Sequence, residues 1–471
     1  MSEPVTHPAG AETGRDPGSW RDPSGFVFRR DGAILRQIAP SFGPDWEAYL
    51  ASGLHERLVK AGSVLAFEDV PLDRALDPAN AWRVIRPEQL DLISYPYEWS
   101  FGQLKDAALL TLDIQTQALA AGLTLRDASA YNIQFRGPRP VLIDSLSFER
   151  HVEGSPWVAY RQFCEHFLAP LALMSIRDVR AGRMLRAWID GIPLDLASTL
   201  LPGRTKARFG LLTHLHLHAR AQREHAGDDG AKSKTVSIST ERVGALVGHL
   251  RKTVEGLRWE PAGTEWADYA DNTSYTDAAT AAKARLVETM LRDAGGDVVW
   301  DLGANTGRYS AIAAGLGRRV VSWDIDPAAV ERNHQALKSS GETRITPLII
   351  DLADPSPAQG WALAERASLV ERSNADVLLG LALVHHLAIG RNVPLPMVAS
   401  FFAELAPDLV LEWVPREDPM VRKLLAGRKD IFDGYHEDGF RAAFEGAGWE
   451  VCAREPIETS ARVLYRFRRR A

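Results

Sequence analysis

The sequence predicts an α/β protein with two units: an α+β unit in the N-terminal part and a doubly wound, mainly parallel sheet in the C-terminal part. Three observations lead to this expectation. From Thr276 onward, short apolar runs alternate with helical patterns, as in a parallel sheet whose strands are joined by helices. Before residue 220, strand-like runs come first and helical patterns follow. A polar stretch that contains glycine separates the two parts.

The N-terminal part is expected to begin with a disordered tail over residues 1–25, which are rich in Gly, Pro and charged residues. An α+β unit over residues 26–220 follows. Its first run, residues 25–38, predicts two strands around an Arg-Asp-Gly turn. Apolar residues at helical spacing then predict helices at Leu104–Ala121, which ends before Gly122, at Trp157–Met174 and at Asp178–Ile189.

The C-terminal unit is expected over residues 241–471, after a linker at 221–240, and begins with a lead-in helix from about Glu241 to Leu257. Five apolar runs predict the strands of the parallel sheet, and two terminal runs predict edge strands. The arginine-rich last run is interpreted as a solvated edge. The seven runs are Val298–Trp300, Arg319–Trp323, Thr346–Ile350, Val377–Leu379, Leu409–Leu411, Trp449–Cys452 and Arg462–Arg466.

The bulk composition is typical of a soluble globular protein, with 45% hydrophobic and 25% charged residues. A net charge of -6 supplies no global field that would attract nucleic acid. The two cysteines, Cys164 and Cys452, argue against a disulfide scaffold and favour a reducing compartment. No uncharged apolar run reaches the ~18 residues that a membrane helix needs. We therefore expect a cytoplasmic protein without a nucleic-acid partner or a membrane span, and its oligomeric state stays open.

A glycine-containing turn, Asp301-Leu-Gly-Ala-Asn-Thr-Gly307, directly follows the first predicted strand of the C-terminal unit. Ligands of open parallel sheets bind at the carboxyl ends of the strands, and this is the first such end. Gly303 and Gly307 allow a tight turn, and the helix that begins near Thr306 offers N–H groups to a carboxylate. The next strand ends at Asp324, at a spacing that suits an acid bound to ribose hydroxyls.

The competing interpretation of this turn is a dinucleotide site, which requires GxGxxG so that the backbone can contact a pyrophosphate. The turn reads GANTG, with Asn305 at the position of the middle glycine and no third glycine. S-adenosylmethionine has no phosphate and carries a cationic aminoacyl end. A turn preceded by Asp301 therefore favours S-adenosylmethionine.

The segments DLGANTGRYS and VLLGLALVHHL, with the strand that ends at Asp324, resemble successive motifs of class I S-adenosylmethionine-dependent methyltransferases, from about Thr276 to the C-terminus. The resemblance implies a Rossmann-like fold, although Asn305 departs from the commoner DxGxGxG. The alternative is that Asp324 and Asp351 only cap helices. The resemblance places Asp301, Gly303, Ala304, Asn305 and Gly307 around the aminoacyl part, Asp324 and Ile325 at the ribose, Asp351 and Leu352 at the adenine edge, and Leu381, between Gly380 and Ala382, beside the cofactor.

Two histidines, His385 and His386, follow the fourth strand, where an acceptor would bind. A hydroxyl acceptor needs a base, and an imidazole can take its proton near neutral pH. The alternative is that one of them packs against the sheet or hydrogen-bonds a loop carbonyl. Glu412, Tyr269 and Tyr275 are weaker candidates for site residues.

A second pattern lies in the N-terminal unit, where Leu125–Asn132 contains DxxxxN and Asp144 follows twelve residues later. The order resembles the catalytic loop of protein kinases, which implies a kinase-like α+β unit in which Asp127, Asn132 and Asp144 would hold a hydroxyl and magnesium ions around ATP. No Gly-rich loop or VAIK-type lysine is recognisable, and Ser-Leu follows Asp144 in place of Phe-Gly. An active kinase and a degenerate one both remain open.

Taken whole, the chain resembles bacterial NoeA-like nodulation methyltransferases from about Phe26 onward, through the segments DASAYNIQF, IDSLSFE and PWVAYRQFCEHFLAPLALM. The resemblance implies methyl transfer to an oxygen or nitrogen of an unidentified small molecule or glycan, with ATP-magnesium as a possible second ligand. The alternatives are a non-catalytic binding protein with a degenerate kinase-like module and a bifunctional kinase-methyltransferase.

Three histidines alternate with leucines at His214, His216 and His218. On a strand they would share one face and could bind a metal. A helix with scattered polar positions is the expected structure, and no metal site is predicted.

Overall fold

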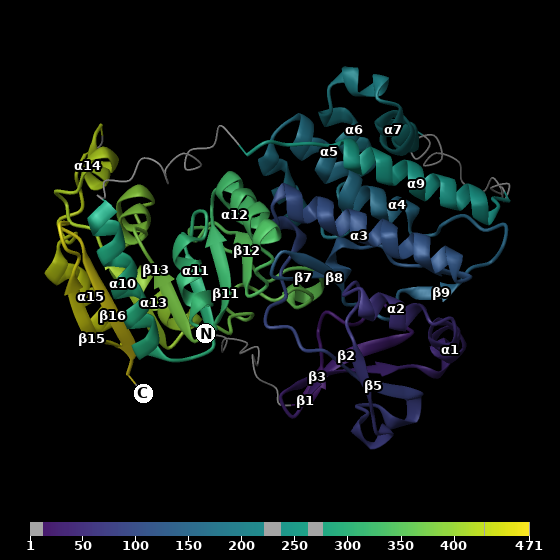
Figure 1. Cartoon of the computed structure of the whole chain (residues 1–471), viewed down its shortest axis with the longest axis horizontal. Coiled ribbons are helices and arrows are strands. Elements are labelled where there is room, and N and C mark those ends of the chain that lie inside the picture. Colours follow the sequence, from purple (N-terminus) through teal and green to yellow (C-terminus); the bar gives the residue numbers. More distant parts are fainter. Residues whose placement is uncertain (1–12, 221–236, 262–276, 428, 471) are drawn as a thin grey trace, which may run out of the picture.

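The computed structural model describes residues 13–220, 237–261, 277–427 and 429–470. We call residues 13–261 the N-terminal half and residues 277–470 the C-terminal half. Each half is organised around one larger sheet, and the two halves lie side by side (Figure 1).

The sheet of the N-terminal half is antiparallel, with the strand order β1-β2-β3-β5-β4. The predicted hairpin is confirmed, since β2 and β3 pair along their whole length. Its turn residues Asp31 and Gly32 have φ angles of 51° and 74°, the left-handed pair that suits a two-residue turn between twisted strands. The strands are β1 (Thr13–Arg15), β2 (Gly25–Arg30), β3 (Ala33–Ile38), β4 (Phe67–Val70) and β5 (Arg83–Pro87).

The first described residues correct the expectation of a disordered tail. Strand β1 pairs with β2, Arg126 bonds to Asp22 at 2.6 Å, and Arg21 bonds to Glu365 at 2.6 Å. Charged residues that suggested disorder are thus held by ion pairs with distant segments. The prediction is wrong for residues 13–25, and residues 1–12 lie outside the described part of the chain.

The longest helix of this half is α3 (Phe101–Ala120), which confirms the helix predicted at Leu104–Ala121. Ser100 and Gln103 form a capping box at its start, and Gly122 follows its end with a φ of 74°.

The other two predicted helices are also present, with different helical geometry. The stretch predicted at Trp157–Met174 is α4 (Tyr160–Phe163), a π-helical turn and α5 (Ala169–Ile176) in succession. The stretch predicted at Asp178–Ile189 is the 3₁₀ helix η7 (Val179–Arg186), which the Asp178 side chain caps.

The remaining elements of this half are short. The pairs β6/β9 and β7/β8 are antiparallel two-stranded sheets. The bounds are α1 (Gly43–Ala51), α2 (Leu54–Lys60), η4 (Pro96–Glu98), β6 (Leu123–Leu125), β7 (Ile133–Arg136), β8 (Arg139–Leu142), β9 (Phe148–Arg150), α6 (Leu194–Leu200) and α7 (Phe209–Leu211).

The histidine run lies in helical structure, as expected: His214 and His216 belong to the π-helix Leu212–Leu217, and His218 follows it in the next helical residues. His214 bonds to the Tyr160 hydroxyl at 2.8 Å and to His249 at 2.7 Å, and His216 lies 2.8 Å from the Thr205 hydroxyl. These imidazoles have partners in the core. In the described ranges, no three His, Cys, Asp or Glu side chains are grouped as metal ligands.

Helix α9 (Thr240–Gly256) corrects the predicted boundary between the units. It packs along α3 of the N-terminal half, and Lys105 Nζ donates to the carbonyls of Glu255 and Leu257. Its apolar stripe, which includes Val243 and Leu250, is buried there. The helix therefore belongs structurally to the N-terminal half. Most of the predicted linker at 221–240 lies outside the described residues.

The C-terminal half contains a seven-stranded sheet in the order β12-β11-β10-β13-β14-β16-β15. The first five strands are parallel and the last two are antiparallel, which confirms the doubly wound, mainly parallel sheet. The strands are β10 (Val298–Leu302), β11 (Arg319–Asp324), β12 (Ile345–Ile349), β13 (Val377–Gly380), β14 (Asp408–Trp413), β15 (Trp449–Pro456) and β16 (Val463–Arg469).

Strand β16 is not the edge strand that its arginines suggested. It lies between β14 and β15, and Arg466, with a side chain 10% exposed, pairs with Asp408 of the neighbouring strand. The buried positions of β16 are filled by residues such as Tyr465 and Phe467. Cross-strand charge pairing thus allows an arginine-rich run inside the sheet.

Helices cover both faces of the C-terminal sheet. Alternate strand residues point to opposite faces: Val299 and Leu379 pack with α10, α11 and α12, whereas Trp300 and Leu378 pack in the cluster that contains α13 and α15. The bounds are α10 (Asp277–Ala294), α11 (Arg308–Gly315), α12 (Pro327–Ser340), α13 (Leu395–Leu405), α14 (Pro419–Leu425) and α15 (Glu437–Gly446).

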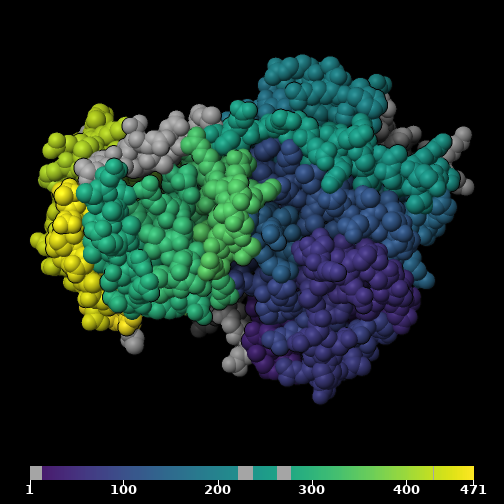
Figure 2. Space-filling model, in the orientation of Figure 1, coloured from purple at the N-terminus to yellow at the C-terminus, as the bar shows by residue number. Residues whose placement is uncertain are grey.

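The second of these faces shares its core with the N-terminal half. One buried cluster joins Trp300 and Leu348 of the sheet to Leu104 and Ala108 of α3 and to Phe135 of β7. In the space-filling view, α12 lies directly against the N-terminal half (Figure 2). Among the described residues, no helix combines the length and the apolar character needed to cross a membrane.

Candidate active site

The turn Asp301–Gly307 leaves the carboxyl end of β10, the strand from which the chain order runs outward in both directions. Gly303 and Ala304 both donate their N–H groups to the Trp323 carbonyl at 2.9 Å, which fixes the turn against β11. Gly307 has a φ of 82°, and a Cβ there would lie 2.7 Å from the Asn333 side chain. Glycine is therefore strongly favoured at the start of α11.

Asn305 closes the turn with its own backbone in the left-handed region, at a φ of 50°. Its N–H donates to Asp324 Oδ2 at 2.7 Å, and its side-chain Oδ1 accepts the Thr306 N–H at 2.8 Å. The Thr306 N–H, which was expected to be free for a carboxylate, is thus engaged inside the turn. The left-handed backbone explains why Asn can replace the glycine of the commoner motif.

Asp301 is a buried carboxyl group beneath this turn, 1% exposed. Burial raises its pKa to about 7, and the negative charge of Asp324 adds to this rise. The hydrogen bond from Ser310 Oγ to Asp301 Oδ2, at 2.6 Å, acts in the opposite direction and lowers the pKa. The charged form of Asp301 is therefore poorly stabilised by the protein alone.

Asp324 is a second buried carboxyl group at the end of the neighbouring strand. Burial raises its pKa to about 6. The hydrogen bonds that it accepts from the N–H groups of Asp326 and Asn305 act in the opposite direction and lower the pKa. Helix α12 is capped by Asp326, whose Oδ1 accepts the Ala328 N–H at 2.8 Å. The alternative that Asp324 caps this helix is therefore wrong. Ile325, beside it, is 38% exposed.

Asp351 follows β12, one strand further along the sheet edge. It accepts the Ala353 N–H at 3.0 Å and pairs with Arg391 at 3.2 Å. No α-helix follows it, so it closes a turn and does not cap a helix. Leu352 is partly buried and Leu381 is buried at the end of β13.

The two candidate bases follow β13 and differ in their exposure. His385 is fully buried, and neither ring nitrogen has a hydrogen-bond partner among the described residues. Burial lowers the pKa of His385 well below its usual value and lowers that of His386 to about 4. Both rings are therefore neutral at pH 7. The packing of His385 agrees with the alternative that one of the two belongs to the core.

A buried charge cluster, not predicted from the sequence, lies beside the turn Asp301–Gly307. Lys283 of α10 bonds to Glu412 Oε2 at 2.7 Å, and the same oxygen accepts the Ala382 N–H at 2.7 Å. Arg462 pairs with Asp418 at 2.7 Å and lies 3.5 Å from Glu412. Glu412, a weaker candidate from the sequence, thus anchors the segment after β13. The available signal was one lysine on the otherwise apolar stripe of α10.

The kinase-like residues come together in the N-terminal half. Burial raises the pKa of Asp127, and the negative charge of Asp144 raises it further. Asp144 pairs with Arg36 of β3 and accepts a hydrogen bond from Ser147. Burial raises the pKa of Asp144, but the Arg36 charge and these hydrogen bonds outweigh burial and lower it. Asn132 Nδ2 lies 3.5 Å from Ser147 Oγ.

Arg36 was not predicted, because the kinase pattern has a lysine at this place in the site. It ends the run Ala33-Ile-Leu-Arg36 on the third strand of the sheet, and its guanidinium reaches the acid predicted to bind metal. Tyr269 and Tyr275 lie outside the described residues.

The chain is 36% identical over 471 residues to nodulation protein NoeA of Rhizobium meliloti strain 1021. The match covers 98% of this chain and 97% of that protein. The chain belongs to the NoeA family. No family model matches it. The resemblance to NoeA, predicted from about Phe26 onward, is thereby confirmed, and the match extends over 98% of the chain.

Two solved structures that are similar to this NoeA-family chain each match less than half of it. Magnesium protoporphyrin IX methyltransferase from Synechocystis PCC 6803, with bound SAH, is 16% identical at a TM-score of 0.32 and covers 44% of this chain and 96% of its own. The bifunctional kinase-methyltransferase WbdD is 15% identical at a TM-score of 0.29 and covers 45% of this chain and 44% of its own.

Proposed function

We propose that the chain is an S-adenosylmethionine-dependent methyltransferase that transfers a methyl group to an oxygen or nitrogen of a small molecule or glycan. The observation that carries this proposal is the pair of buried carboxyl groups, Asp301 and Asp324, on either side of a glycine turn at the carboxyl ends of β10 and β11. The name of the NoeA relative, a nodulation protein, indicates a process and no acceptor.

A cationic ligand fits this donor set. Burial raises the pKa of both Asp301 and Asp324, so the protein alone compensates their ionised forms only in part, although the charge of Lys283 acts to lower the pKa of Asp301. S-adenosylmethionine brings a sulfonium and an ammonium group, whose positive charge would stabilise both carboxylates. When bound, it supplies a methyl group on a positively charged sulfur, which is activated for displacement.

A phosphate-containing dinucleotide fits the turn poorly. Its backbone N–H groups from Gly303 to Gly307 all donate within the protein: to the Trp323 carbonyl, to Asp324, to the Asn305 side chain and to the Ala304 carbonyl. A pyrophosphate needs such donors free, and two neighbouring carboxylates would repel it. These engaged N–H groups favour S-adenosylmethionine over a dinucleotide, as the GANTG motif does.

The chain itself would bind and orient the reactants. Asp301, with Gly303, Ala304, Asn305 and Gly307 behind it, would hold the aminoacyl end; Asp324 and Ile325 would hold the ribose; Asp351 and Leu352 would flank the adenine, with Leu381 beside it. Because in-line methyl displacement depends mainly on alignment, such positioning supplies much of the catalysis.

A proton acceptor would be required only for a hydroxyl or protonated acceptor. His386 is the better placed of the two candidates, since it is partly exposed whereas His385 is buried. At pH 7 the His386 ring is neutral and able to accept a proton, because its pKa is lowered to about 4. Its low basicity restricts it to acceptors that lose a proton readily.

Isothermal titration calorimetry of the full chain with S-adenosylmethionine, S-adenosylhomocysteine and NAD tests the proposal. We expect both sulfur nucleosides to bind and NAD not to bind. Binding of NAD alone, or of none of the three, would contradict the proposed cofactor.

A second candidate activity, nucleotide binding by a kinase-like N-terminal half, is favoured by the meeting of Asp127, Asn132 and Asp144. The Arg36 guanidinium already pairs with Asp144, so magnesium would have to compete with it. Titration with ATP-magnesium, repeated on Asp144→Ala, tests this candidate. Binding that the substitution removes would support a bifunctional protein, and no binding to the native chain would leave a degenerate module.

A further inference from the structure

The connection between β12 and β13 lacks the helix found between the other parallel strands. Residues 350–376 are all described and contain no α-helix; they form one 3₁₀ turn, Trp361–Leu363, and an isolated β-bridge between Gln359 and Arg366. The sheet face that a helix would cover there packs instead into one cluster with the N-terminal half, and β12 contacts both η4 and β7. The connection therefore depends on the N-terminal half for its position.

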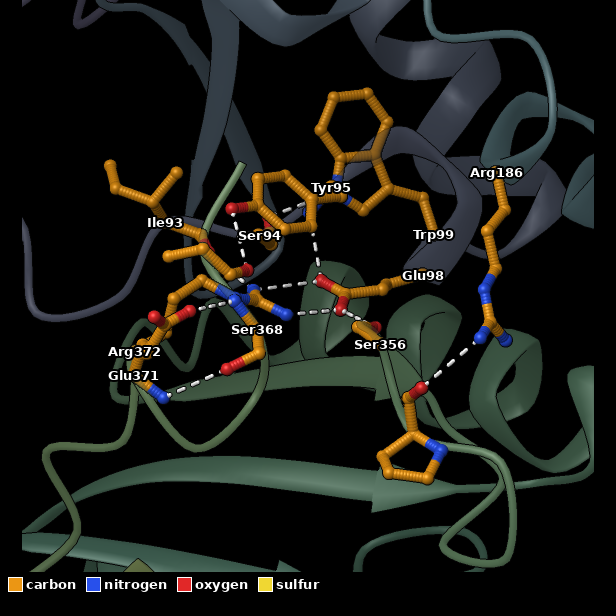
Figure 3. Close-up of polar contacts among 12 residues, drawn as sticks. Ile93, Ser94, Tyr95, Glu98, Trp99, Arg186, Ser356, Ser368, Glu371 and Arg372 are labelled. Atoms are coloured by element: carbon orange, nitrogen blue, oxygen red, sulfur yellow. Dashed lines mark hydrogen bonds and ion pairs between the residues drawn. The ribbon is translucent and has the colours of Figure 1, made fainter. Parts of the chain in front are cut away.

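A buried ion pair joins the segment around η4 to this connection. Glu98, 1% exposed, pairs with Arg372 and accepts a hydrogen bond from Ser356. The Arg372 guanidinium lies 4.1 Å above the Tyr95 ring, and the Tyr95 hydroxyl donates to the Ala367 carbonyl at 3.0 Å. Figure 3 shows Glu98 between Arg372 and Ser356, with Tyr95 alongside. Buried pairs of this kind constrain geometry strongly, because breaking one leaves an uncompensated charge.

A second attachment reaches the turn that begins at Asp351. Arg186 of η7 donates to both carboxylate oxygens of Asp354, at 2.9 and 3.0 Å, a planar, bidentate geometry. Asp354 closes the turn that begins at Asp351, since its N–H donates to the Asp351 carbonyl at 2.9 Å. The turn is thus held by two sets of hydrogen bonds: those from Arg186 of the N-terminal half to Asp354, and the one within the turn from Asp354 to Asp351.

A small cavity lies between the two sides of this contact. Its volume is about 20 Å³, and its lining includes Glu98 and Arg186 from the N-terminal half and Ile350, Asp351 and Ser356 from the connection. This is room for about one water molecule, so the two sides are packed almost directly against each other.

We propose that the N-terminal half forms the outer wall of the adenine end of the cofactor site, with Glu98, Arg186 and Arg372 as positioning residues for the Asp351 turn. This inference rests on the proposed methyltransferase function. The N-terminal half then has a role in cofactor binding that requires no nucleotide of its own.

The test compares two ligands that share the adenine and ribose, S-adenosylhomocysteine and 5′-methylthioadenosine, on Arg186→Ala of the full chain. Because this substitution removes the bonds that hold the turn at the adenine end, we expect the affinity for both ligands to fall by about tenfold. This lies within the range by which residues remote from a ligand modulate binding. The matched control is Arg180→Ala on the same helix, whose side chain bonds to Asp178 two residues away, and we expect it to bind both ligands like the native chain.

A ligand-free measurement keeps the proposal falsifiable on its own. Amide hydrogen exchange at Ala353 and Asp354 is expected to accelerate in Arg186→Ala and in Glu98→Gln, with folding of each variant checked by thermal unfolding. Native exchange rates together with native affinity in Arg186→Ala would overturn the proposal. If the native chain binds no sulfur nucleoside, the proposed function fails, and the adenine wall fails with it even where the exchange rates change.

Discussion

At the scale of single residues, Asp301 is a carboxyl group whose ionisation the fold opposes. Its pKa is raised by burial to about 7, compared with about 3.9 in an unfolded chain. Between these values the folded state binds more protons than the unfolded state, so this group makes the free energy of unfolding decrease as pH rises from about 4 to 7. Because burial destabilises the ionised form of Asp301, a cationic ligand bound nearby would lower its pKa.

The substitution Asp301→Asn separates stability from cofactor binding. Asparagine keeps the shape and can accept the Ser310 hydrogen bond without a buried charge, so we expect the unfolding temperature at pH 8 to equal or exceed that of the native chain. Affinity for S-adenosylmethionine should fall at least tenfold. Calorimetry checks both, with Asp293→Asn on the exposed end of α10 as the control. Unchanged affinity in Asp301→Asn would contradict the role of the turn.

Cofactor affinity should also depend on pH. A bound cation lowers the raised pKa values of Asp301 and Asp324, so protons are released on binding and affinity increases with pH through the range of about 6 to 7. The slope should be steeper for S-adenosylmethionine than for S-adenosylhomocysteine, which lacks the sulfonium charge. Titrations from pH 5 to 8 measure this, and a flat profile for both ligands would argue against the pair of acids as the cation site.

The positions of these acids followed from the sequence, whereas their environment did not. Asp301 and Asp324 each end an apolar run, which is a local pattern. The partner of Lys283, by contrast, is Glu412, 129 residues away, and no local pattern indicates that pairing. Burial of His385 depended likewise on packing around the strand ends.

At the scale of elements, the start of α11 depends on one glycine. We expect Gly307→Ala to lower the free energy of unfolding by at least about 1–2 kcal/mol, the cost of a left-handed backbone for a residue with a Cβ, and more through contact with Asn333. Gly315→Ala, in the same helix with open space around it, is the control and should stay within about 1 kcal/mol of the native chain. Urea denaturation measures both. Equal stability of the two variants would contradict the turn geometry.

Elements were predicted well where the periodic pattern was local and less well where assignment required a neighbour. The strands and α3 appear close to their expected bounds. Helix α9 was expected from its apolar stripe, but the stripe does not say which half it packs on, and it is α3 that buries it. Strand β16 seemed to be an edge because its arginines looked solvated, yet Arg466 and Arg468 are paired with Asp408.

At the scale of the whole molecule, the two halves share a core. Removing the N-terminal half would expose the sheet face that bears Trp300, Trp323 and Leu348, an apolar surface that isolated domains do not leave open. We therefore expect the full chain to unfold in a single cooperative transition and a fragment of residues 277–471 to show none. Differential scanning calorimetry tests this expectation. A fragment that unfolds cooperatively would show that the halves are independent domains.

The sequence by itself determined the alternation of strands and helices along the C-terminal half and the turn Asp301–Gly307. It also determined that Asn305 stands where a phosphate-binding loop has glycine. Each of these features depends on residues close together in the chain. The tertiary structure alone decided how these parts act together. It buries Asp301 and Asp324 and so raises their pKa values, and it places Glu98 against Arg372 across 274 positions. Long-range packing sets both, since burial and charge pairing are properties of neighbours in space and not in sequence.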